Sequence, residues 1–367
     1  ATFGRGFYIL DDFTPLREVT ADLLEKDAHI FPVKDALMYV QQRGRSNQGS
    51  TYHTADNPPF GATFSYFLKE TPKMVQQKRQ EEEKKLFKEG ERIPQPTWDE
   101  QREEELEEKP HLIFSITDDG GNPVRRLTTP ARQGLSRITW DLRYSSPRPV
   151  RLRGNTFNPT ADDTSGFLAM PGRYTVSLHL YHGGELKQLA GPVDFTARVL
   201  DNTTLPAPDR AELVAFQKEM SEMARAIMGT ESFAEELAQR AEYIKQALYQ
   251  TPGAPDELMQ RARRLARDVD DILFQINGPR AKASSEEIPP RPASINSRLR
   301  AMMYAQWRST SRVTGTQRDA FAILKEEFPP LRQKLQQLHD GELKAIEREM
   351  EELGAPWTPG RLPDWKF

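Results

Sequence analysis

One segment constrains the fold of this chain more than any other: Gly134–Tyr144. Apolar and polar residues alternate through it, which predicts a strand that is buried on one face. A second alternating segment, 174–180, follows the turn signal Pro171-Gly172. Together the two segments predict an antiparallel β-sandwich, a scaffold that more often binds or spaces than catalyses.

Length and charge bound the class of protein. The chain has 367 residues, of which 29% are charged and 37% hydrophobic, so we expect two or three soluble domains. A net charge of −3 does not favour nucleic acid as a partner. The absence of cysteine excludes disulfides, thiolate metal sites and cysteine nucleophiles. No apolar run approaches the roughly 20 residues that span a bilayer, so direct membrane insertion is not expected.

The first two regions are short. Residues 1–20 contain an apolar segment, Gly4–Asp12, that predicts a strand in need of a neighbouring sheet. Residues 21–56 predict a connector with a short helix around Leu23. Because a protein rarely begins within a strand, we expect more polypeptide before Ala1 or a separate chain beside it.

The remaining regions differ sharply in composition. Residues 57–200 predict the sandwich, and within it residues 71–109, rich in Glu, Lys, Gln and Arg, predict an inserted helical hairpin or a solvated arm. Residues 201–353 predict an antiparallel helical bundle that begins at a capping residue, Asp209. Residues 354–367 predict an extended tail that lies across another surface.

Within the bundle, the spacing of apolar residues predicts several helices divided by breaks. Pro329-Pro330 is the candidate interruption of the last one. The predicted helices cover Leu213–Ile227, 231–249, 255–276, 295–310 and 316–353.

Two pairs of aspartates are the first candidates for chemistry. Asp11 and Asp12 could form a catalytic or metal-binding carboxylate pair, but the end of a strand explains them better because no convergent partners are visible. Asp118 and Asp119 could offer oxygens to calcium. The glycines 120–121 favour a hairpin turn instead, since glycine tolerates positive φ.

No other residues form a site. His179 and His182 are the closest pair of histidines, but residues three apart on a strand point to opposite faces. Thr164 and Ser165 lie in a polar loop with no neighbouring base. We therefore predict no catalytic, cofactor-binding or metal-ligating residues and no cofactor. The six histidines are His29, His53, His111, His179, His182 and His339.

Aromatic residues on the strands test a ligand-binding role. A carbohydrate-binding sandwich, one candidate class, would expose aromatics on one sheet face. The positions of Phe114, Trp140 and Tyr174 predict burial instead, and Trp140 is expected to pack in the core rather than to contact a ligand.

Charged clusters suggest surfaces for partners. Arginines gather after the Trp140 strand and again on a predicted helix, and both clusters favour a solvated or interdomain face over polyanion binding. The arm either contacts a partner or is a plain exposed insertion, and it offers few apolar anchors. The clusters are Arg143, Arg148, Arg151 and Arg153, and Arg261, Arg263, Arg264 and Arg267; the anchors are Met74, Val75, Leu86 and Phe87.

Several segments resemble a family of large exported bacterial proteins with sortilin-like or BNR-type β-propellers. These proteins are common in Bacteroidetes and are often labelled glycosyl hydrolases. Their last propeller strand is similar to Gly4–Asp12 and precedes a motif like Thr14–Arg17. The start of their post-propeller sandwich resembles Asn57–Ala62. Gly134–Tyr144 resembles their Gly-x-Asn-x-x-x-Trp-Asp-Leu-Arg-Tyr strand, with Ser136 in place of Asn.

Two further matches follow in the same order. Pro171–Tyr174 is similar to the final hairpin of the family, and Ile295–Leu299 to a segment of its C-terminal helices. Two features depart from the family: Phe3 stands where members often have His, and the charged insertion 71–109 is longer.

The resemblance implies a fold class and a role. The fold would be multidomain β plus α: a terminal propeller strand, an immunoglobulin- or fibronectin-like antiparallel sandwich with a charged helical insertion, and a C-terminal helical bundle. The chain would be a non-catalytic, extracytoplasmic region that braces a propeller and offers a surface to other subunits. Its partner would be the N-terminal propeller, in the same chain or a separate one. The alternative is the accessory region of a propeller-type glycoside hydrolase or peptidase whose active site lies outside this chain.

Overall fold

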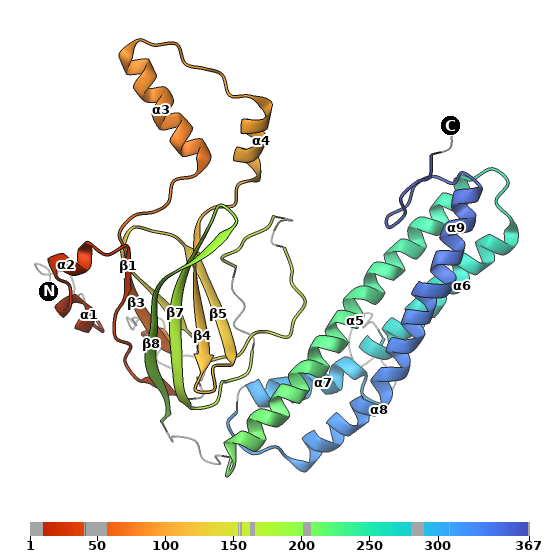
Figure 1. Cartoon of the computed structure of the whole chain (residues 1–367). Coiled ribbons are helices and arrows are strands. Elements are labelled where there is room, and N and C mark those ends of the chain that lie inside the picture. The colour runs from red at the N-terminus through yellow and green to blue at the C-terminus, as the bar shows by residue number, and fades with distance from the viewer. Residues whose placement is uncertain are drawn as a thin grey trace, which may run out of the picture. The chain divides into compact units, whose positions relative to one another are not determined.

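A computed structural model divides the chain into two compact units, drawn in Figure 1. The first comprises Ala1–Ser146 and Leu152–Thr204, and the second comprises Pro147–Arg151 and Leu205–Phe367. Most of the predicted strand Gly4–Asp12 lies outside the described residues. The structure describes residues 10–39, 41, 57–152, 154, 156–161, 166–200, 207–279, 290–307 and 309–365.

In the described part of the first unit, eight strands form two sheets. Alternating burial along them matches the alternating sequence, as in β4, where Leu112, Phe114 and Ile116 are buried. One sheet has the order β1 (Ala28–Ile30), β3 (Ala62–Leu68), β6 (Gly134–Trp140). The other has the order β2 (Ala36–Met38), β8 (Glu185–Val199), β7 (Gly172–His182), β4 (His111–Asp118), β5 (Pro123–Pro130).

The two sheets share one hydrophobic core, rich in aromatic rings. Phe64 of β3 stacks on Phe114 of β4 with ring centroids 6.1 Å apart. The Trp140 ring meets Tyr174 edge-on at 5.0 Å and has no exposed surface. The prediction that Phe114, Trp140 and Tyr174 are buried is therefore confirmed.

Strand β6 ends earlier than its sequence pattern predicts. The alternation continues to Tyr144, but the pairing of β6 with β3 stops at Trp140. Leu142 adopts φ 55°, a left-handed conformation that costs a leucine on the order of 1–2 kcal/mol. Burial compensates, since the side chain of Leu142 has no exposed surface and Trp140 Nε1 donates to the Arg143 carbonyl at 2.9 Å. The backbone turns here, so both large side chains enter the core.

The segment predicted as a connector contributes to both sheets. Strand β1 pairs antiparallel with β3, whereas β2 pairs parallel with β8. The expectation of a purely antiparallel arrangement is thus wrong at β2. This strand has only three residues, too few for a recognisable alternation, and it pairs along the β8 edge of the larger sheet. Two short helices, α1 (Thr14–Arg17) and α2 (Ala21–Leu24), precede it, and α2 is the helix predicted around Leu23.

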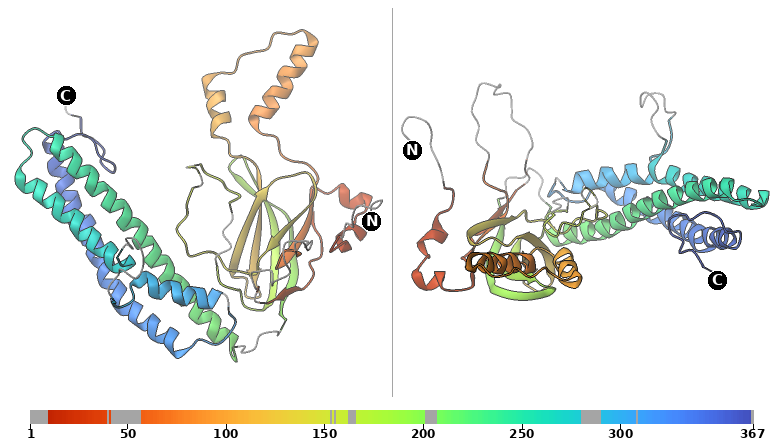
Figure 2. Two further views of the ribbon diagram at one scale, coloured as in Figure 1. Left: turned by 180° about the vertical axis from the view of Figure 1, so that it is seen from behind. Right: turned by 90° about the horizontal axis from the view of Figure 1, so that it is seen from above.

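Two helices stand between β3 and β4: α3 (Val75–Glu89) and α4 (Trp98–Leu106). They form the hairpin predicted for residues 71–109, and no residue of either helix is buried. Figures 1 and 2 show this pair, in orange, projecting from one end of the sheets. We call it the arm.

Long helices build the second unit. Asp209 caps the first of them as predicted, since its Oδ1 accepts from the amides of Ala211 and Glu212 at 2.8 and 3.1 Å. The two helices predicted over 213–249 are one continuous helix of 41 residues, because Gly229 costs only about 1 kcal/mol while Ile227 and Ala234 on either side are fully buried. The elements are α5 (Arg210–Gln250), α6 (Asp256–Asn277), α7 (Ile295–Trp307), α8 (Gly315–Gln337), η2 (Leu338–Leu343) and α9 (Lys344–Glu352).

The candidate interruption at Pro329-Pro330 does not break the helix either. Both prolines lie inside α8 on its exposed side, where water can satisfy the two carbonyls that lose their amide partners. The irregular segment is the π-helical turn η2. The wider turn shifts the direction in which later side chains point. Leu343, Ile346 and Met350 therefore face the core, as Leu335 does before the turn.

The tail after α9 folds back on its own unit. Trp357 Nε1 donates to the Arg361 carbonyl at 2.7 Å, and Arg361 donates to the carbonyls of Ala355 and Pro356. A Cβ atom added at Gly360 would lie 2.5 Å from the guanidinium carbon of Arg240 on α5, so the chain passes close to that helix.

Candidate interaction surfaces

One aspartate of each candidate pair takes a structural role. Asp12 Oδ1 accepts from the Thr14 amide at 3.0 Å and pairs with Lys34 at 2.8 Å, and Asp11 lies exposed beside it. Asp118 Oδ1 accepts from the amides of Gly120 and Asn122 in the β4–β5 turn. The bonds of Asp118 confirm the hairpin turn predicted for this segment.

The predicted histidine pair lies on one strand. His179 and His182 are three residues apart on β7, which places them on opposite faces. Among the described residues, no three His, Cys, Asp or Glu side chains come close enough to hold a metal ion. His53, Thr164 and Ser165 lie outside the part of the chain that the structure describes.

In each predicted arginine cluster, one arginine is engaged in contacts within its own unit. Arg143 donates to the Gly166 carbonyl at 2.8 Å, while Arg148 and Arg151 are exposed and Arg153 lies outside the described residues. On α6, Arg261 donates to Glu342 at 2.8 Å and Glu349 at 2.5 Å. These two ion pairs join α6 to η2 and α9, so Arg261 is engaged within the bundle.

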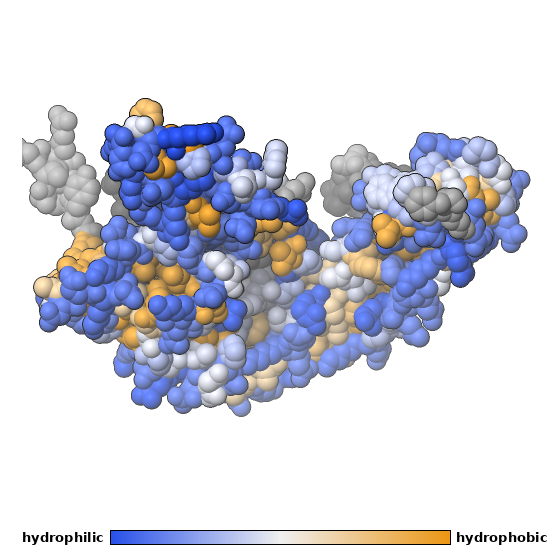
Figure 3. Space-filling model, turned by 45° about the horizontal axis from the view of Figure 1, so that its top comes forward, coloured by the Kyte–Doolittle hydropathy of each residue, from blue (hydrophilic) through white to orange (hydrophobic). Residues whose placement is uncertain are grey.

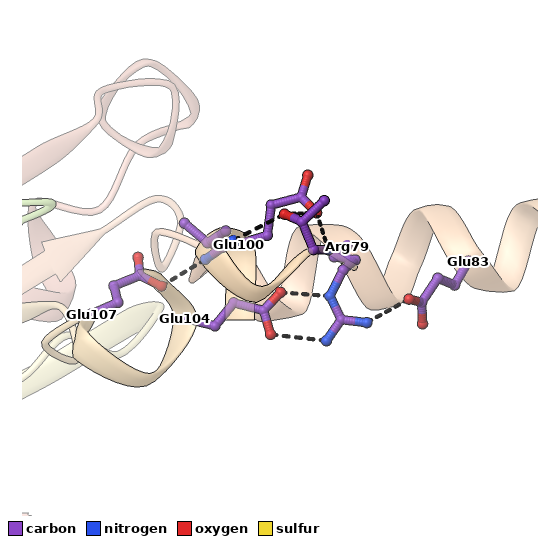
Figure 4. A network of polar contacts seen from close by, with 7 residues as sticks. Arg79, Glu83, Glu100, Glu104 and Glu107 are labelled. Carbon is purple, nitrogen blue, oxygen red and sulfur yellow. Dashed lines mark hydrogen bonds and ion pairs between the residues drawn. The ribbon is translucent and has the colours of Figure 1, made fainter. Parts of the chain in front are cut away.

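Arg79 joins the two helices of the arm, as Figure 4 shows. Its guanidinium donates twice to the Glu104 carboxylate on α4, at 2.5 and 2.8 Å, and once to Glu83 on α3. Glu107 accepts from the Val75 amide at 2.7 Å. Sequence reasoning did not single out these residues. Arg79 and its two glutamates lie among many other charged residues, and only the pairing of the two helices shows which of them meet.

The same contacts shift the ionisation of the arm. The hydrogen bonds from Arg79 hold the pKa of the Glu104 carboxyl below its ordinary value, and the two glutamates raise the pKa of Arg79. Backbone and hydroxyl bonds from Thr97, the N-cap residue of α4, lower the pKa of Glu100. The arm is thus fastened by polar contacts rather than by a core.

Large apolar side chains of the arm lie in solvent. Trp98 is 87% exposed, Phe87 75% and Leu106 71%. Of the predicted anchors, Val75 and Phe87 are exposed, and Met74 and Leu86 are half-buried. Trp98 and Leu106 were not among those anchors, because a single apolar residue between charges gives no periodic signal. In Figure 3 the arm is largely hydrophilic with isolated apolar side chains.

A second set of exposed apolar residues surrounds α1 and α2, on the left of Figure 3. The segment is tied to β6, since Arg137 donates to the Asp12 carbonyl. Beneath it, Leu23 packs with Phe31 and Phe67 in a small separate core. We call this surface the N-terminal face, and its exposed members are Leu10, Phe13, Leu16 and Leu24.

A shallow recess of about 490 Å³ lies in the second unit, between the end of α6, the start of α7 and α8. Arg291 lies over the Phe274 ring at 4.7 Å from its centroid and lines the recess with Ser294 and Glu327. The sequence did not predict it, because its walls come from separate helices. Its charges are mixed, so it favours no single ligand.

Comparisons with known proteins add no relative. No family model matches the chain, and no curated protein or solved structure matches it either. None of the described helices is long and apolar enough to cross a membrane.

Proposed function

We propose that this chain is a non-catalytic structural and protein-interaction region of an exported protein, and that its first unit braces a β-propeller. In this proposal the two sheets form an immunoglobulin- or fibronectin-like sandwich, the N-terminal face contacts the propeller, and the arm offers a surface to a further subunit. The ordered motifs that resemble propeller proteins support this assignment.

The observation that carries the proposal is the N-terminal face. Four apolar side chains, each about half exposed, cluster within fifteen residues where the chain continues toward residue 1. A small protein seldom leaves such a group in water without a partner, because each buried aliphatic or aromatic side chain contributes about 1.5–3 kcal/mol.

The test begins with the native protein. Purification from its source, followed by intact mass and N-terminal sequencing, is expected to give either a polypeptide longer than these 367 residues or a copurifying propeller chain. A native polypeptide that matches this chain alone, with no companion, contradicts the proposal.

A pair of variants locates the contact. Phe13→Ser with Leu16→Ser is expected to release a separately purified propeller part from this chain. Leu186→Ser is the matched control, because Leu186 on β8 is equally exposed but belongs to another surface. Equal retention of the propeller by both variants would show that the N-terminal face is not the contact.

A further inference from the structure

The outward face of α4 carries two apolar side chains that nothing in the arm covers. At 100° per residue, Glu104 and Glu107, which meet α3, lie on one side of α4. Trp98 and Leu106 lie on the other side, two turns apart, with Arg102 between them. Tryptophan is among the side chains enriched at the centres of protein interfaces, and here an exposed one shares a helix face with an exposed leucine.

This helix is also strongly acidic. Residues 98–108 contain seven carboxylates and a single arginine. Glu104 pairs with Arg79, Glu100 accepts from the Thr97 amide, and Glu107 accepts from the Val75 amide. Four carboxylates have no ion pair among the described residues: Asp99, Glu103 and Glu105 lie beside the outward face of α4, and Glu108 follows the end of the helix.

The placement of these charges works against the helix itself. Five of the carboxylates follow residue 102, near the C-terminus of α4, where the helix dipole is already negative. Glu103 and Glu107 are also a like-charge pair at i, i+4, which weakens a helix. Local stability does not explain this pattern, but attraction of a cationic partner does.

We infer that the outward face of α4 docks a basic amphipathic helix of a partner protein. Leucine-type side chains of that helix cover Trp98 and Leu106, and its lysines or arginines face the four unpaired carboxylates. Two helices that pack side by side bury such a stripe while their flanking charges set orientation. The inference rests on the partner surface in the proposed function and names the chemistry of that partner.

Arg79 prepares this surface. Its two bonds to Glu104 hold α4 against α3 before any partner arrives, so less conformational freedom is lost on binding. In that role Arg79 is a positioning residue and does not touch the partner.

The test uses the whole chain and a capped amphipathic peptide of leucine and lysine, with leucines at i, i+3 and i+4 spacing. We expect saturable 1:1 binding by titration calorimetry, and no binding of the analogue with glutamate in place of lysine. Trp98→Ala with Leu106→Ala should weaken the binding at least about tenfold. The control is Phe87→Ala, an exposed aromatic of the arm that lies on α3 and should bind as the wild type does.

The charge requirement has a matched control too. Neutralising the four unpaired carboxylates of α4 should weaken binding by a similar factor and remove most of its dependence on salt. The control neutralises four exposed carboxylates of the second unit and should change neither. The two sets are Asp99→Asn, Glu103→Gln, Glu105→Gln and Glu108→Gln, and Glu235→Gln, Glu236→Gln, Asp270→Asn and Asp271→Asn.

Several results overturn the inference. These are failure of the wild type to bind the basic peptide, equal binding of the acidic analogue, or equal binding by the Trp98 variant. Self-association of the chain that Trp98→Ala abolishes would assign the face to a second copy instead. A chain that lacks residues 75–106 still carries the N-terminal face. If this chain binds the propeller while the whole chain fails to bind the basic peptide, the inference about α4 is wrong and the proposed function stands.

Discussion

The arm and the C-terminal bundle are both built from charged helices, yet they are held by opposite means. On α6, one face carries a continuous buried stripe, Leu258, Ala262, Leu265, Val269, Ile272 and Ile276. On α3 and α4 no residue is buried, and two helices meet through Arg79 and Glu104. The difference teaches that a high content of Glu, Lys and Arg does not distinguish a packed helix from an exposed one; the apolar spacing does.

The largest effect is expected in the core that supports the arm. Trp140→Ala removes a fully buried ring and should lower the free energy of unfolding of the first unit by about 3–5 kcal/mol. Urea denaturation followed by circular dichroism measures it. Trp140→Phe keeps part of the side-chain volume and should lose less stability. An unchanged midpoint in both variants would show that Trp140 does not pack in the core.

The bundle should respond almost as strongly. Ile272→Ala opens a cavity at a fully buried position of α6 and should cost about 2–5 kcal/mol, seen as a lower denaturation midpoint of the second unit. Gln275→Ala, on the exposed side of the same helix, is the control and should change stability by less than about 0.5 kcal/mol. Similar losses in the two variants would contradict the packing described for α6.

An ion pair in the bundle gives a direct comparison with the arm. Arg240 on α5 donates to Glu347 on α9 at 2.7 Å, and both side chains are largely buried. Arg240→Met leaves the carboxylate without its partner and should cost about 1–3 kcal/mol in thermal or urea unfolding. The double change with Glu347→Leu should recover part of the loss, because an apolar pair replaces the charges. A double variant as unstable as the single one would show that Arg240 acts by packing alone.

The smallest effect is expected at the corresponding pair of the arm. Arg79→Met should leave the midpoint of global unfolding almost unchanged, since exposed ion pairs contribute little to stability. It should instead raise the pKa of Glu104 toward its ordinary value, which carboxyl NMR titration measures. The folded-state pKa of Glu104 lies below its unfolded value, so the contribution of this pair is present above pH about 4.3 and disappears as the pH falls through the depressed folded-state pKa. An unshifted Glu104 in both proteins would show that the two helices of the arm do not meet in solution.

Local patterns were enough for many elements. Alternation placed most of β6, and the glycines 120–121 predicted the β4–β5 turn, where Gly121 has a φ of 76°. Capping chemistry placed the start of α5 at Asp209. Each of these depends on a few neighbouring residues, so the sequence contains the whole cause.

Other features depended on distant contacts. Leu142 turns the chain because the core accepts its side chain, and Gly61 is required where a Cβ atom would lie 1.8 Å from the Trp140 carbonyl. The candidate surfaces also show this division between local patterns and distant contacts. Sequence reasoning identified the charged arm and named Phe87 but not Trp98 among its apolar anchors, because a single apolar residue between charges gives no periodic signal; both side chains are exposed.

By itself, then, the sequence determined where strands alternate, where turns and caps fall, and that residues 71–109 carry charge without a core. Only the tertiary structure decided that α5 runs through Gly229, that a π-turn rather than two prolines changes the phase of the last helix, and that Arg79 meets Glu104. The reason is physical: propensity and hydrogen-bonding pattern act over a few residues, whereas burial and ion pairing act between segments far apart in the chain.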